Sequence, residues 1–143
     1  MRPGTICRRM KRAISAVILA FFTFASFAHS KEFPLTASSS VPAAKGKVDV
    51  DKDQNGNRKV KLEVQHLAKP STLTPAQTNY VVWIQARGRE PENKGQLAVN
   101  DKLEGKLETT TQYEAFDIFV TAEGNPSIAA PEGVEVLRGT VQP

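Results

Sequence analysis

The stretch KVDVDKDQNGNRKVKLEVQ, residues 47–65, decides the fold class of this chain. Valine and leucine alternate with charged residues on both sides of a polar centre, which is typical of strands that bury one face and expose the other. The centre contains Asn55-Gly56, and both residue types tolerate the positive φ that a tight hairpin turn requires. Residues 47–65 are therefore predicted to form a β-hairpin.

The chain beyond this hairpin continues as short β-rich runs separated by Gly, Pro and Asn. Residues 80–84, Tyr-Val-Val-Trp-Ile, are apolar at every position, which predicts a strand buried on both faces with Trp83 in the core. About seven strands, with turn signals about every 8–12 residues and no helical period, predict an all-β fold. We expect an antiparallel immunoglobulin-like β-sandwich. The remaining strands are predicted over residues 95–99, 103–111, 115–123 and 133–141.

Residues 1–28 have the three parts of a secretory signal peptide. A basic block, residues 8–12, precedes an uncharged run over residues 13–28 that ends in Ser26-Phe27-Ala28, with small residues at positions −3 and −1 of a cut before residue 29. The alternative is an uncleaved anchor, but the uncharged run has 16 residues. A membrane-spanning helix needs roughly 20 apolar residues. We therefore predict a periplasmic or secreted protein, with membrane contact only if residues 13–28 stay uncleaved.

Removing the predicted signal peptide changes the charge and the cysteine content. Residues 1–28 hold five of the 19 basic residues and none of the 15 acidic ones, so residues 29–143 carry 14 and 15, a net charge of −1. No block of Lys and Arg follows residue 28, so nucleic acid is not an expected partner. The single cysteine, Cys7, lies in the predicted signal. The mature chain therefore offers no disulfide framework, thiolate metal site or cysteine nucleophile.

The rest of the chain divides into a leader and one domain. Residues 29–45 are rich in Ser, Ala and Pro and are predicted to be a leader or linker, in which Phe33 and Leu35 are able to dock as a short edge strand. Residues 46–143 are predicted to form the β-sandwich domain, which is long enough for a core of its own. Tyr113 is either a tyrosine corner or an ordinary half-buried tyrosine.

Asp51, Asp53 and Asn55 are the candidate ligands of a calcium ion. With Gly56 they match the first half of a calcium loop, where oxygen ligands alternate and a glycine makes the turn. The second half does not match, because Leu62 occupies the position of the bidentate glutamate. Asp and Asn are also favoured in turns, since their side chains bond to their own backbone. The hairpin turn is the preferred interpretation, and no cofactor is predicted.

The sequence contains no evident set of catalytic residues. His66 is the only histidine after His29 and continues the inward-facing alternation of the second hairpin strand, which predicts a polar cap on the core. No Gly-x-Ser-x-Gly elbow frames a nucleophile. We therefore predict a non-catalytic protein that binds a protein or cell-envelope ligand through exposed loops. The loops concerned carry Arg87, Arg89, Glu90, Glu92 and Lys94, or span residues 123–133.

Four short motifs occur in order within residues 46–141: Tyr80 to Ile84, Gly95 to Leu97, Val120 to Pro126 and Pro131 to Leu137. In this order they resemble the extracytoplasmic C-terminal domain of sigma-K-type anti-sigma factors. The resemblance implies an immunoglobulin-like sandwich outside the membrane, without catalytic residues. The sequence shows no zinc-type cytoplasmic domain with His and Cys ligands, so anti-sigma activity is not expected.

Two alternatives to a ligand-binding domain follow from these patterns. One is a calcium-stabilised structural or adhesion module that uses Asp51, Asp53 and Asn55. The other is a membrane-tethered sensor domain, if residues 13–28 are not cleaved.

Overall fold

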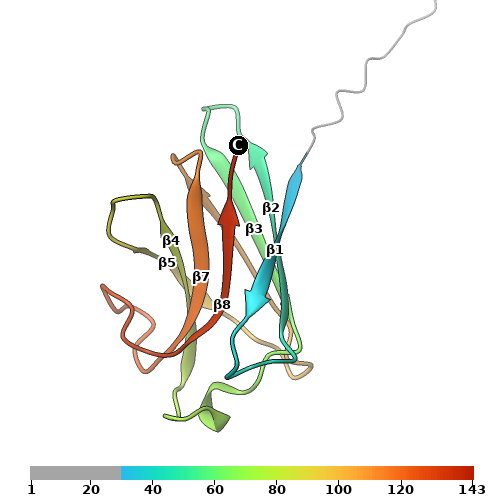
Figure 1. Cartoon of the computed structure of the whole chain (residues 1–143), viewed down its shortest axis with the longest axis vertical. Coiled ribbons are helices and arrows are strands. Elements are labelled where there is room, and N and C mark those ends of the chain that lie inside the picture. The colour runs from blue at the N-terminus through green and yellow to red at the C-terminus, as the bar shows by residue number, and fades with distance from the viewer. Residues whose placement is uncertain (1–29) are drawn as a thin grey trace, which may run out of the picture.

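Eight antiparallel strands and no α-helix make up the described part of the chain, residues 30–143, in a computed structural model (Figure 1). The all-β prediction is confirmed, with one strand more than expected. The predicted signal peptide, residues 1–28, lies outside the described residues. Within residues 30–143 no helix has the length and apolarity to cross a membrane. The strands are β1 (Lys31–Ala37), β2 (Lys45–Lys52), β3 (Arg58–Gln65), β4 (Asn79–Gln85), β5 (Glu92–Leu97), β6 (Gly105–Thr111), β7 (Phe116–Glu123) and β8 (Glu135–Val141), with a short 3-10 helix over Pro70–Thr72.

The strands form one continuous, nearly closed sheet in the order β5-β4-β7-β8-β1-β2-β3-β6. β1 joins the two halves, since residues 31–35 pair with β2 and residues 36–37 pair with β8. Residues 31–37 thus form a strand inside the sheet rather than a leader or an edge strand. Pro34 is tolerated there because residues 31–35 pair with β2 alone, while the Pro34 backbone faces the other side, where its carbonyl oxygen lies near Gly139 of β8. The two free edges, β5 and β6, meet where Val99 bridges Gly105.

The hairpin predicted over residues 47–65 is confirmed. β2 and β3 pair without interruption from Lys45 opposite Gln65 to Lys52 opposite Arg58. In the turn, Asp53 Oδ1 accepts the backbone N–H groups of Asn55 and Asn57, each at 2.8 Å, and Gly56 has a φ of 83°. The polar centre of this stretch therefore works as a turn, as its composition predicts.

The core lies inside the sheet and has a smaller counterpart on its outer face. β4 is buried along its length, but period two divides its side chains between the two faces. Tyr80, Val82 and Ile84 belong to the main core. Val81 and Trp83 instead pack with Phe119 and Ile128 in a separate cluster. Trp83 is buried as predicted, but in this outer cluster, under the connection between β7 and β8. We call that connection, residues 124–134, the strap.

Candidate ligand-binding end of the sheet

One end of the sheet gathers chain segments that are far apart in the sequence. The turn between β2 and β3, the connections β4–β5 and β6–β7, the start of β1 and the end of β8 all lie there. In Figure 1 the chain end marked C lies beside the turn between β2 and β3. We call this the pocket end, because two adjacent hollows open on it.

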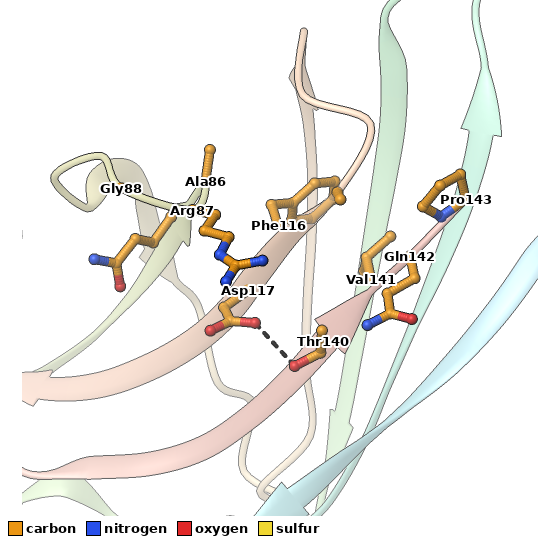
Figure 2. Close-up of a pocket in the computed structure, with 11 residues that line it drawn as sticks. Ala86, Arg87, Gly88, Phe116, Asp117, Thr140, Val141, Gln142 and Pro143 are labelled. Carbon is orange, nitrogen blue, oxygen red and sulfur yellow. Dashed lines mark hydrogen bonds between the residues drawn. The ribbon is translucent and has the colours of Figure 1, made fainter.

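The larger hollow has a volume of about 600 Å³, within the roughly 300–1,000 Å³ of small-ligand sites. It is lined by residues 85–88, 115–117 and 140–143. The hollow lies at the start of β7, which begins at Phe116. The strands on either side of β7 are β4 and β8, and the chain segments at their ends, residues 85–88 and 140–143, flank the hollow. Figure 2 shows Arg87 and Gly88 on one side of the hollow and Gln142 and Pro143 on the other.

The acidic group of this hollow is already engaged. Asp117 Oδ1 accepts a hydrogen bond of 2.8 Å from Thr140 Oγ1, drawn in Figure 2, and Asp117 Oδ2 lies 3.1 Å from Arg138 Nη1. Arg138 also forms a double hydrogen bond with Glu135. The carboxylates of Glu135 and Asp117 raise the pKa of Arg138 above its usual range. Asp117 is therefore neutralised by its neighbours, whereas Arg87 is exposed on the rim and forms no ion pair with any residue of 30–143.

The smaller hollow, of about 170 Å³, lies on the other side of Val141, Gln142 and Pro143. Phe33 and Val50 provide its apolar lining, and Lys31, Lys52 and Arg58 bring positive charge. Glu114 is the one acid in this lining, and it lies 3.6 Å from Arg58. Lys31 and Lys52 form no ion pair within the described residues. The linings of the two hollows therefore combine paired acids with three cations that lack an acidic partner: Lys31, Lys52 and Arg87. Asp51, Asp53 and Glu90 also lie at the pocket end without an ion pair among the described residues, but outside these linings.

Side chains hold the β4–β5 connection in place beside the larger hollow. Gln85 Nε2 donates to the carbonyl of Arg89 at 3.0 Å, and the Arg89 guanidinium lies 5.5 Å from the centre of the Tyr113 ring. The Tyr113 hydroxyl donates to Glu92 at 2.7 Å. The hydrogen bond from Tyr113, together with a second one that Lys94 donates to Glu92, lowers the pKa of Glu92. Tyr113 is thus half-buried and bonded to a side chain, so it is not a tyrosine corner, whose hydroxyl bonds to the backbone.

The candidate calcium ligands lie at the pocket end, with Asp51 on β2 and Asp53 and Asn55 in the turn that follows it. Asp53 is bonded to the turn backbone, as described above, and Asp51 lies on β2 opposite Lys59. Among residues 30–143 no group of three or more His, Cys, Asp and Glu side chains is placed to hold a metal ion. The calcium interpretation stays a prediction, for which the geometry offers no support beyond the turn.

His66 does not have the predicted inward orientation. It is exposed and has a φ of 56°, so the alternation of β3 ends before it. Leu67 takes the buried position instead, with 2% of its surface exposed. Sequence reasoning also missed Lys31 and Lys52, since no local pattern relates them to Arg87 and only the strand order brings them to one end.

Comparison of the chain with protein-family models, with characterised proteins and with solved structures finds no significant match, so the geometry of residues 30–143 is the basis for assigning a function.

Proposed function

We propose that the protein is an exported, non-catalytic binding domain that holds an anionic ligand, carried by a partner protein or by the cell envelope, at the pocket end. The observation that carries this proposal is the pair of adjacent hollows with Lys31, Lys52 and Arg87 around them. The predicted signal peptide supports export. We further propose that the nearly closed sheet is an immunoglobulin-like sandwich, an architecture that binds partners through loops at its ends.

The charges that line the two hollows, not the net charge of the chain, favour an anion. Residues 29–143 carry a net charge of −1, so there is no general attraction for anions. At the pocket end, however, Glu114 is paired with Arg58 and Asp117 with Arg138. An acidic group that enters either hollow would meet a cation without displacing an existing partner. Such contacts are exposed to solvent, so binding should weaken as the salt concentration rises.

The test uses purified residues 29–143 and two probes, a hexaglutamate peptide and vesicles that contain phosphatidylglycerol. Amide NMR shifts should change at the pocket end with one of them. Arg87→Gln should weaken that binding about threefold, as expected for one exposed charge contact. Lys102→Gln, an exposed lysine in the connection at the opposite end, is the matched control.

The two probes distinguish the source of the ligand. Binding of the peptide alone indicates an acidic segment of a partner protein, and binding of the vesicles alone indicates the envelope. Failure of both probes to bind at millimolar concentration, or equal loss in the Arg87 and Lys102 variants, would contradict the proposal.

One observation favours a second candidate, the membrane-tethered sensor. β1 begins at Lys31 at the pocket end, so an uncleaved segment over residues 13–28 would attach the domain to the membrane by this end. That arrangement fits the resemblance to the extracytoplasmic domain of sigma-K-type anti-sigma factors. Mass determination of the exported protein tests it, because a chain that starts at His29 has no tether.

A further inference from the structure

The two free edges of the sheet differ in regularity. The pairing of β5 with β4 shifts between Val82 and Trp83, so Lys94 has no cross-strand partner, and Gly95 has a φ of 120°. A bulge of this kind twists an edge and opposes the addition of another strand. β6 instead pairs with β3 along all seven of its residues without a shift. Val99 bridges Gly105 at the start of β6. The outer side of β6 after Gly105 is therefore a regular edge, with the backbone N–H and C=O groups of alternate residues unpaired by β3.

The side chains of β6 give this edge a self-complementary charge pattern. Lys106 and Glu108 are exposed, and the half-buried Leu107 lies between them. We propose that two copies of the chain pair antiparallel along β6, about a two-fold axis at Leu107, so that the two sheets become continuous. This inference is independent of the ligand proposed for the pocket end.

The register follows from the charges. With the axis at Leu107, Lys106 lies opposite the partner's Glu108 and Glu108 opposite the partner's Lys106, and each directly opposed pair of opposite charges is favourable. Moving the axis to Glu108 would place Glu108 opposite the partner's Glu108, which is unfavourable. Within one copy Lys106 lies 3.7 Å from Glu63 and Glu108 lies 3.1 Å from Lys59. The pairing would therefore join two existing rows of alternating charge into one.

Charge reversal tests this pairing. Sedimentation equilibrium of residues 29–143, from about 10 μM to about 1 mM, should show a monomer–dimer equilibrium. Lys106→Glu and Glu108→Lys should each weaken association about fivefold or more, because each places like charges opposite one another in both symmetric pairs. The double variant K106E/E108K should restore it. Lys102→Glu is the control for a charge reversal away from the edge, and a melting curve verifies that each variant folds.

A cross-link gives a second measurement that does not depend on charge. The chain after residue 28 has no cysteine, so Leu107→Cys would place a single thiol on the proposed axis, within disulfide distance of its copy. Mild oxidation should then produce a covalent dimer, and Lys102→Cys should not. Three results would each overturn the proposal: a monomer at every concentration, a dimer whose association is unchanged by the single charge reversals, or a double variant whose association stays as weak as that of the single variants.

Discussion

At the residue scale, the outer cluster depends on a chain of hydrogen bonds that starts at the only tryptophan. Trp83 Nε1 donates to Thr121 Oγ1 at 2.8 Å, and Thr121 Oγ1 donates to Glu123 Oε1 at 2.8 Å. The same carboxylate oxygen accepts the backbone N–H groups of Glu132 and Gly133, each at 3.0 Å. Glu123 is only 2% exposed, and a buried carboxylate requires such donors. The network thus fixes one end of the strap to the sheet.

Replacing Thr121 should show how much this network contributes. Thr121→Val removes the acceptor for Trp83 and one donor for Glu123, so two buried polar groups lose a partner. The free energy of unfolding should fall by about 2 kcal/mol, measured by urea titration and followed by Trp83 fluorescence. Thr110→Val, at an exposed position on β6, should change it by less than about 0.5 kcal/mol. Equal losses in both variants would show that the network is not the cause.

The Tyr80 hydroxyl should ionise at an unusually high pH. Burial raises its pKa to about 12, and its hydroxyl donates to the carbonyl of Ala68 at 2.7 Å. The unfolded chain ionises near pH 10, so this group's contribution to stability is complete below about pH 10 and is lost as the pH rises towards 12. Phenolate absorbance should show a step near pH 12 that Tyr80→Phe abolishes. Ionisation of Tyr80 near pH 10 in the folded protein would contradict this.

The turn at Asp53 leads to a prediction about the effect of calcium on stability. Because Asp53 Oδ1 already accepts two backbone N–H groups and Leu62 lies where a glutamate ligand would be needed, we expect millimolar calcium to leave the melting temperature unchanged. Magnesium at the same concentration controls for ionic strength. A rise with calcium alone would favour the calcium-stabilised module instead.

At the element scale, the strap is held so closely that one glycine has no room for a side chain. A Cβ at Gly133 would lie 1.7 Å from the carbonyl oxygen of Ala122, whereas a Cβ at Gly124, at the other end of the strap, would meet only Gln77 Oε1 at 3.5 Å. Gly133→Ala should therefore displace the strap and destabilise the fold by about 1–3 kcal/mol or more. Gly124→Ala is the matched control and should change stability little. Urea titration of both variants tests this, and equal stabilities would contradict it.

The strands that could be predicted from the sequence are those with a clear period. The hairpin over residues 47–65 and the apolar run over residues 80–84 were recognisable because alternation and uninterrupted apolarity are local properties. β1 was not, because Pro34 and the small residues around it resemble a linker, and one of its two partners, β8, lies far along the chain. His66 was misjudged since alternation alone does not show where a strand ends. The strap was expected as a loop, but its packing over Trp83 depends on tertiary contacts.

At the scale of the whole molecule, the candidate site illustrates why function was harder to predict than fold. Lys31 begins β1, Lys52 ends β2 and Arg87 follows β4. No spacing in the sequence relates the three residues. They meet only because β1, β2 and β4 place those positions at one end of a single sheet. Arg87 was recognised as a loop residue from its Gly and Pro neighbours, but not as the rim of a hollow, which requires the end of β8.

The charge of the whole molecule provides the last prediction. The full chain has a net charge of +4 and an isoelectric point near 9.3. Residues 29–143 have a net charge of −1. If the predicted signal peptide is removed, the remaining chain should focus below pH 7, because at that pH it is already negative. Isoelectric focusing beside the uncleaved chain measures this directly.

A protein that focuses near pH 9.3 after export would retain residues 1–28, and the tethered sensor would then replace the free binding domain. Focusing below pH 7 has a further consequence for the pocket end. A net negative molecule repels anions at long range, so affinity for hexaglutamate or anionic vesicles would have to arise from Lys31, Lys52 and Arg87 at short range. Long-range repulsion and short-range attraction are both screened by salt. Because the two effects of salt partly cancel, salt should weaken equilibrium binding only modestly, by far less than it weakens the binding of a generally basic protein.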